Sequence, residues 1–169
     1  LSSAQQRMWF LNRLDTDSAL NNVPVTLLLR GELDVDALQA AVGDVVGRHE
    51  SLRTVYPEID GVGYQQVRDE AETHVGMDVV RIARDDALAA VTQFFTRGFD
   101  VTVEIPFRVR LFHITDPAGA APEYVLAFVA HHISADGLSM APLSRDVMTA
   151  YLARHGGSAP QWAPLPVQH

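Results

Sequence analysis

Hydrophobic residues recur along the chain with two periods, and each period predicts one kind of element. Spacings of three and four residues predict helices, whereas alternation and short β-branched runs predict strands. The predicted helices cover residues 3–14, from Asp34 or Asp36 to Arg48, from Asp85 or Asp86 to Gly98, and about 138–153. The predicted strands cover residues 23–30, 64–67, 77–82, 107–114 and 124–130, and residues 48–56 pass from a helix end into a further strand. This order predicts an α/β (α+β) fold with a mixed or largely antiparallel sheet and flanking helices.

Particular residues place some of these elements. Pro24 has no N–H for a ladder, so the strand over residues 23–30 is expected to lie at a sheet edge or to begin near this residue. In the first helix, Met8, Leu11 and Leu14 form a predicted apolar stripe, and Phe10 is expected in the core. Asp60 and Gly61 predict a tight turn between two short strands.

Two histidines stand where a predicted buried strand ends. Residues 131–137 read HHISADG, and a helical pattern follows. Adjacent strand side chains point to opposite faces, so His131 and His132 are not expected to share a ligand. One should face a cavity and the other the packing. Asp136 could orient the imidazole, pair with an arginine or cap the following helix.

Composition narrows the possible functions. The 169-residue chain carries a net charge of −8, and all its Lys and Arg positions are arginine, so a nucleic acid or an anionic membrane is a poor partner. No cysteine is present, which excludes a disulfide framework and a thiol nucleophile. No apolar run approaches the ~20 residues of a membrane span. No signal peptide is visible, so we expect a cytoplasmic protein. The sequence does not begin with Met, so we also expect it to be part of a longer chain.

Three motifs together indicate a family. Residues 3–11 (SAQQRMWFL), 48–54 (RHESLRT) and 131–139 (HHISADGLS) resemble the first three core motifs of condensation domains of nonribosomal peptide synthetases. The third is the HHxxxDG motif. Gly98, Phe99 and Asp100, with Pro106 and Arg108, are also typical of that family. The resemblance covers essentially the whole chain.

The resemblance implies an architecture. Condensation domains are pseudo-dimers of two lobes with the chloramphenicol-acetyltransferase-like fold. Residues 1–157 resemble the N-terminal lobe, and residues 158–169 resemble the start of the linker to a C-terminal lobe. The later core motifs, the latch and the floor loop of the substrate tunnel have no counterpart in this sequence. We therefore expect the isolated fragment to be inactive.

The resemblance also implies a reaction. In the family, a carrier-bound amine attacks a carrier-bound acyl or peptidyl thioester, and an amide forms. The implied partners are donor and acceptor carrier domains and the C-terminal lobe. The phosphopantetheine arms of the carrier domains hold the substrates, so we expect no cofactor bound directly to this chain. We also expect no metal site. His132 is the candidate catalytic imidazole, as base or positioning group, and the Gly137 N–H could polarise the thioester carbonyl.

The other motif residues are expected to support this site. His131 is assigned a structural role. Asp136 is expected to form an ion pair that shapes the corner, with Arg53 as the first candidate partner and Arg48 as the second. A helix cap by Asp136 is the competing interpretation, and a helix C-terminus explains Arg48 equally well.

Other functions remain open. An acyltransferase with a hydroxyl acceptor shares HxxxDG, but the first two motifs argue against it. Epimerisation domains share HHxxxDG. A binding-only relative recruits partners and usually has a degraded histidine motif, whereas this motif is intact. A metal hydrolase is the weakest alternative, because no third ligand has a convincing spacing. Within condensation domains, Asn22, Val23 and Pro24 favour the type that accepts an L-configured donor.

Overall fold

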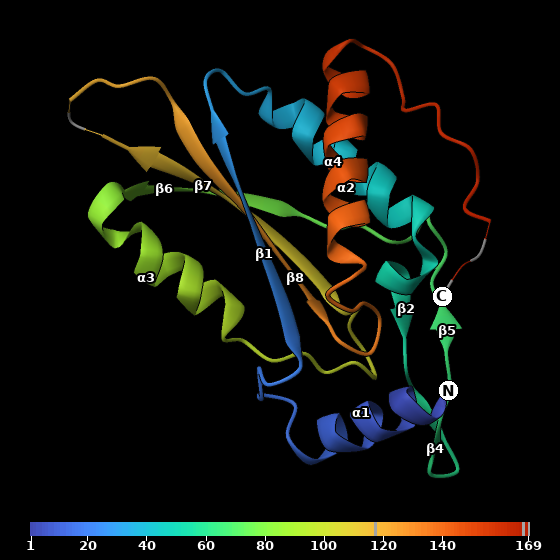
Figure 1. Cartoon of the computed structure of the whole chain (residues 1–169). Helices are drawn as coiled ribbons and strands as arrows, with labels where there is room; N and C mark the ends of the chain where they lie inside the picture. The colour runs from blue at the N-terminus through green and yellow to red at the C-terminus, as the bar shows by residue number, and fades with distance from the viewer. Residues whose placement is uncertain (117, 167, 169) are drawn as a thin grey trace.

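A mixed four-stranded sheet forms the centre of the molecule (Figure 1). The computed structural model describes residues 1–116, 118–166 and 168. The strand order is β1-β8-β7-β6; β8 is antiparallel to both neighbours, and β6 runs parallel to β7. The strands are β1 (Asn22–Arg30), β6 (Met77–Ala83), β7 (Phe107–Thr115) and β8 (Glu123–His131). The predicted mixed sheet is confirmed, and β1, which contains Pro24, is an edge strand.

Helices cover both faces of this sheet. Figure 1 shows α2 (Val35–Arg48) and α4 (Met140–His155) on one side and α3 (Arg84–Phe95) on the other. The α2 helix begins where the Asp34 side chain accepts a hydrogen bond from the Ala37 N–H at 2.9 Å, one of the two predicted caps. Among the described residues, no helix is both long and apolar enough to cross a membrane.

The alternation in β7 explains how the layers pack. Phe107, Val109 and Leu111 belong to the core shared with α2 and α4, whereas Phe112 and Ile114 pack with α3. Strand β8 lies between β1 and β7 and is buried on both faces, because each face has a helical layer. A strand covered on both faces can be apolar at every position, which accounts for the continuous run over residues 124–130.

The first helix, α1 (Ser3–Leu14), lies at one end of the sheet (Figure 1). Its N-terminus is closed by a capping box between Ser2 and Gln5. The inward positions follow a spacing of three and four residues that differs from the predicted stripe. They are Gln5, Met8, Trp9 and Asn12.

Two predictions for this helix are therefore wrong. Phe10 is not in the core, and of the predicted stripe of Met8, Leu11 and Leu14 only Met8 faces inward. Phe10 is 58% exposed, and Leu11 and Leu14 are also exposed. The reason is that the buried Asn12 side chain bonds to two backbone groups: it donates to the Phe99 carbonyl at 2.6 Å and accepts from the Val101 N–H at 3.3 Å. Two buried backbone groups thus fix the rotation of α1.

Short strands complete the same end of the molecule. The chain passes through a 3₁₀ turn, η1 (Glu50–Arg53), before two small antiparallel pairs form. The pairs are β2 (Thr54–Val55) with β5 (Gln66–Val67), and β3 (Glu58–Ile59) with β4 (Val62–Gly63). Asp60 and Gly61 both have positive φ, 52° and 79°, which confirms the predicted tight turn.

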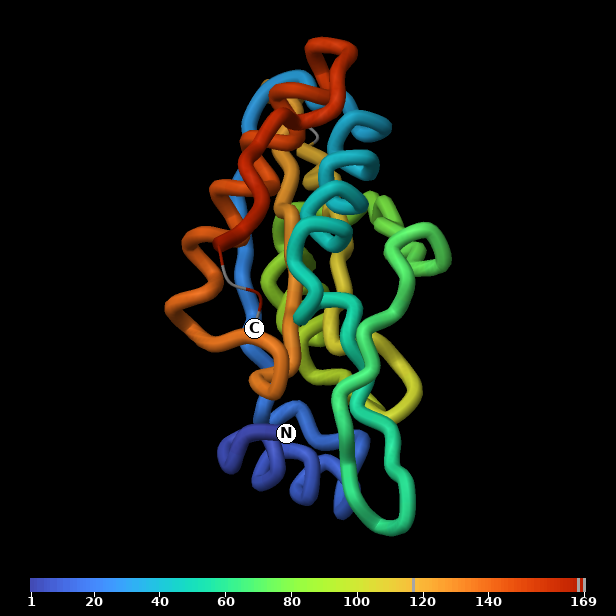
Figure 2. The backbone as a smooth tube through the Cα atoms, turned by 90° about the vertical axis from the view of Figure 1, so that its right-hand side faces the viewer, coloured from blue at the N-terminus to red at the C-terminus, as the bar shows by residue number. Residues whose placement is uncertain are grey.

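This hairpin lies beside α1 (Figure 2). A Cβ on Gly63 would lie 2.6 Å from the Trp9 ring, so only glycine permits this close approach. The Trp9 indole N–H also donates to the Tyr56 carbonyl at 2.8 Å. Helix α1 is therefore held against the 54–67 region by packing and by a hydrogen bond.

Residues beyond α4 follow the surface of α2 without a helix or strand in residues 158–166. Arg48 anchors them: its guanidinium donates to the Ala163 carbonyl at 2.6 Å and lies 4.7 Å from the centre of the Trp162 ring. The Gln168 amide also donates to the Arg48 carbonyl at 3.0 Å.

Candidate active site

The histidine motif begins at the end of β8, where the chain leaves the sheet. The His131 backbone N–H still donates to the Pro106 carbonyl at 3.0 Å, and the His132 N–H donates to the Asn21 carbonyl at 2.7 Å. The two side chains then separate: His131 is 1% exposed, whereas His132 is exposed. The prediction that one histidine faces the packing and the other a cavity is confirmed.

His131 is buried against Phe99. Its ring stands edge-on to Phe99, with 6.2 Å between the centroids. Its Nδ1 lies 3.1 Å from the Ile133 N–H and accepts a hydrogen bond from it. Burial, with a smaller contribution from His132, lowers the pKa of His131 to about 4, so the ring is neutral at physiological pH.

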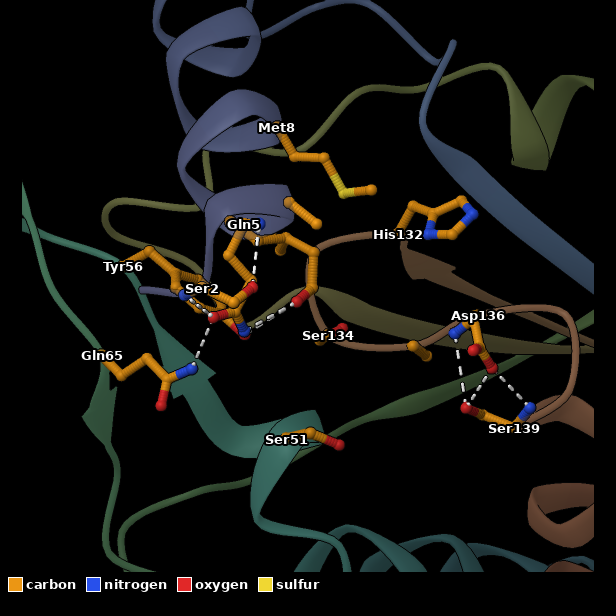
Figure 3. A pocket seen from close by; sticks show the side chains of 13 residues that line it. Ser2, Gln5, Met8, Ser51, Tyr56, Gln65, His132, Ser134, Asp136 and Ser139 are labelled. Atoms are coloured by element: carbon orange, nitrogen blue, oxygen red, sulfur yellow. Dashed lines mark hydrogen bonds between the residues drawn. The ribbon is translucent and has the colours of Figure 1, made fainter. Parts of the chain in front are cut away.

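His132 lines an open pocket of about 400 Å³. Figure 3 shows that three separate segments form this pocket: the start of α1, the region of Ser51 to Gln65, and the loop after β8. Met8 extends from α1 into the same space, and Tyr56 and Gln65 lie on the opposite side of Gln5 from His132. An exposed imidazole beside a cavity can reach a bound substrate, which the buried His131 cannot.

A second, more apolar cavity of about 290 Å³ adjoins the first. Ser51, Ser134, Ala135 and Ser139 line both cavities. The second cavity extends between η1, the start of α4 and residues 165 and 166. The two cavities therefore form one hollow region, with the loop that follows β8 lining both parts.

Asp136 closes the turn that leads into α4. Its Oδ1 accepts from the Ser139 N–H at 2.8 Å and from the Ser139 hydroxyl at 2.6 Å. These hydrogen bonds hold the pKa of Asp136 below its usual value. Asp136 therefore closes the turn before α4 and does not cap that helix, whose N-cap is Ser139 without a side-chain cap hydrogen bond. No hydrogen bond joins Asp136 to the His132 ring within the described residues.

The predicted ion pair between Asp136 and Arg53 or Arg48 is wrong for this structure. Arg53 lies near Glu50 (3.7 Å) and donates to the Arg68 carbonyl at 2.5 Å. It thereby joins η1 to the β5 segment. Asp136 is on the exposed loop, whereas the Arg53 guanidinium is directed to Glu50 and Arg68, and its Nε is buried without a hydrogen-bond partner among the described residues.

Arg48 has a different carboxylate partner. Its Nε lies 3.1 Å from the Asp146 carboxylate on α4, which also contacts His49 Nε2 at 2.8 Å. The three side chains are between 14% and 19% exposed. They therefore join the end of α2 to the middle of α4, behind the second cavity.

Gly137 is exposed and has no steric requirement for glycine within this chain. A Cβ built at this residue would meet no atom within 4 Å, and its φ lies outside the left-handed region. Tight backbone geometry, one of the two predicted reasons for this glycine, is therefore not the explanation. Close approach of a substrate stays a prediction.

Sequence reasoning did not assign a role to Gln5 or Tyr56, although both line the pocket. Both donate to the carbonyl of Ile133, next to His132. The signal for Gln5 was a polar residue on the same helical face as Met8 and Trp9. For Tyr56, it was a hydroxyl-bearing ring in a buried strand, which usually requires a partner. Within the described residues, no group of three His, Asp or Glu side chains is arranged to hold a metal ion.

Comparison with known proteins agrees with this geometry. A family profile described as "Condensation domain" matches residues 1–167. The chain belongs to the condensation domain family. As a member of that family it is 49% identical, over its whole length, to part of an isonitrile lipopeptide synthase of Mycobacterium tuberculosis (strain ATCC 25618 / H37Rv). It is 44% identical to part of a dimodular nonribosomal peptide synthase of Bacillus subtilis (strain 168). It spans only 7% of the length of each.

Solved structures confirm the chloramphenicol-acetyltransferase-like fold of this condensation-domain chain. The X-domain from teicoplanin biosynthesis superposes with a TM-score of 0.88 at 38% identity, covering 99% of this chain and 35% of the other. The starter condensation domain of the rhizomide synthetase RzmA superposes with a TM-score of 0.82 at 22% identity, covering 96% of this chain and 39% of the other. The second likeness concerns the fold alone.

Proposed function

We propose that this chain is part of a catalytic condensation domain that forms peptide bonds in nonribosomal peptide synthesis. Residues 1–157 form the N-terminal lobe, and residues 158–169 begin the connection to a C-terminal lobe. The donor is an acyl or peptidyl thioester on one carrier domain, and the acceptor is an aminoacyl group on another. The observation that carries the proposal is the intact histidine motif, with His132 exposed at a pocket and His131 buried behind it.

The reaction needs an unprotonated amine next to the thioester. The amine nitrogen bonds to the carbonyl carbon, the C–S bond breaks, and one amine proton passes to the leaving sulfur. Imidazoles exchange protons near neutral pH, so His132 can accept a hydrogen bond or a proton from the amine and return it. Holding two tethered reactants in line supplies a further large part of the acceleration.

The other motif residues support this chemistry in our proposal. The Gly137 N–H, on the exposed loop, donates to the thioester oxygen as negative charge develops. His131 and Asp136 fix the loop that carries His132, through contacts with Ile133 and Ser139. Arg53 and Arg48 do not line the cavities, and they support the site by holding η1 to the β5 segment and α2 to α4. Phosphopantetheine arms of the carriers deliver both substrates, so the chain itself binds no cofactor.

The test uses the complete condensation domain with both loaded carrier domains. Peptide formation is followed by intact mass for wild type, His132→Ala and the control His74→Ala, whose side chain is exposed outside the pocket. We expect a loss of about 100-fold or more for His132→Ala and wild-type rates for His74→Ala. Equal rates for wild type and His132→Ala would refute the catalytic assignment. The isolated 169-residue chain is expected to form no product, because the second lobe is needed.

Partner recruitment is a second candidate function, and one observation favours it. A structure described as the complex of the X-domain and OxyB from teicoplanin biosynthesis superposes on this chain with a TM-score of 0.89 at 37% identity. A recruiting role for the present chain predicts that the complete domain binds a partner protein without forming product. Product formation that depends on His132 would decide against recruitment as its main role.

A further inference from the structure

The carbonyl of Ile133, the residue after His132, is held by two side chains from distant parts of the chain. The Gln5 amide donates to it at 3.3 Å from α1, across 128 positions of sequence. The Tyr56 hydroxyl donates to it at 3.3 Å from the residue after β2. A carbonyl oxygen has two lone pairs, so this acceptor is fully used.

Both donors are themselves fixed. The Gln5 side-chain oxygen accepts from the Ser2 N–H and from the Gln65 amide, each at 3.0 Å (Figure 3). Tyr56 is 1% exposed, and its backbone carbonyl accepts from the Trp9 indole. Burial raises the pKa of Tyr56 to about 12, so its hydroxyl keeps its proton at physiological pH.

These contacts immobilise the backbone on both sides of His132. Before it, the His132 N–H is bonded to the Asn21 carbonyl. After it, the Ile133 N–H is bonded to the His131 ring, and the Ile133 carbonyl to Gln5 and Tyr56. The imidazole of His132 lines the pocket next to this fixed backbone. Only its own side-chain rotations remain free, which favours a defined distance to a bound amine.

We propose that Gln5 and Tyr56 are positioning residues for His132 and act through the Ile133 carbonyl. This inference rests on the proposed function, since it requires His132 to take part in the reaction. It also connects the first core motif, which contains Gln5, with the residues that directly follow the second. The α1 helix and the segment after Arg53 place one donor each on the same carbonyl.

The experiment uses the complete condensation domain and substitutions that remove one hydrogen bond. Gln5→Glu keeps an acceptor oxygen for Ser2 and Gln65 but removes the donor to Ile133. Tyr56→Phe removes the other donor and keeps the ring. We expect Tyr56→Phe to lower kcat about 5- to 10-fold, the effect of one hydrogen bond, and Gln5→Glu to lower it at least as much, because its carboxylate also repels the Ile133 carbonyl oxygen. KM for the acceptor-loaded carrier should be unchanged in both. The matched controls Gln6→Glu and Tyr64→Phe alter neighbours that do not line the pocket and should keep wild-type kinetics.

A double-mutant cycle separates positioning from general folding damage. In a His132→Ala background, Gln5→Glu and Tyr56→Phe should cause no further loss, because the group that they position is gone. Wild-type kcat for both single variants would overturn the proposal, and so would an undiminished loss in the His132→Ala background. If Gln5→Glu lowers the melting temperature, its loss of activity could reflect unfolding, and the kinetics of Tyr56→Phe then test the proposal. Should His132→Ala itself retain full activity, the proposed function fails instead.

Discussion

Acidification should destabilise this fold through one buried side chain, His131. The ring is 1% exposed and packs against Phe99. Its neutral Nδ1 accepts a hydrogen bond from the Ile133 N–H. Protonation would place a charge in an apolar site and would turn this acceptor into a donor that faces another donor. The folded state therefore resists protonation of His131, whereas the unfolded chain does not.

The size and sign follow from the two pKa values. His131 changes from 6.5 in the unfolded chain to about 4 in the fold, a difference of about 2.5. At 1.36 kcal/mol per pKa unit this corresponds to about 3 kcal/mol. Because the folded pKa is the lower one, the unfolded chain binds more protons inside this window. Stability is therefore complete above about pH 6.5 and falls as the pH falls towards 4, by about 2 kcal/mol between about pH 7.5 and 5.

Urea unfolding of the chain at several pH values, followed by tryptophan fluorescence, measures this loss. His131→Asn is the informative variant, because its side-chain oxygen can still accept from Ile133 but cannot titrate. We expect a flatter dependence of unfolding free energy on pH for this variant. The control, His74→Asn at an exposed residue, should keep the wild-type slope. An equal slope in His131→Asn and wild type would refute the reasoning.

Two further predictions concern ion pairs and glycines, and both are measured by urea unfolding. Asp146→Ala leaves Arg48, which is 14% exposed, without its carboxylate and should lower the free energy of unfolding by about 3 kcal/mol. Asp44→Ala removes its ion pair with Arg154, which is more exposed, and should lower it by about 1 kcal/mol or less. Equal losses would contradict the role of burial. Gly98→Ala should cost about 2 kcal/mol or more, since its Cβ would lie 2.6 Å from a backbone carbon. Gly43→Ala, in open space on α2, should stabilise by about 0.5–1 kcal/mol, and stabilisation by both would contradict the steric argument.

Local patterns were enough to predict most of the elements. Asp34, one of the two residues predicted to begin the second helix, caps it, and Pro24 lies on an edge strand. The face of α1 was predicted wrongly, because hydrophobicity was the only guide. Asn12 forms buried backbone hydrogen bonds that hydrophobicity does not record, and they outweigh the burial of Phe10.

The candidate site shows the same division. The opposite orientations of His131 and His132 follow from strand geometry and were predictable. The partner of Asp136 could not be predicted, because the sequence does not show which arginines or hydroxyls the fold brings close to this carboxylate. Ser139, three residues away, reaches Asp136 first. Arg48 meets Asp146 across 98 positions of sequence, a distance that local patterns do not contain.

The register of β1 has a consequence for synthesis on the ribosome. Each residue of this strand pairs with a residue of β8 between 93 (Arg30 with Glu123) and 109 (Asn22 with His131) positions later. At the usual rate of about 5–20 residues per second, the nascent strand waits about 5–20 s for its partner. During this time its leucine-rich edge is exposed to other chains. A ribosome-bound chaperone that shields residues 22–30 should therefore raise the yield of folded protein.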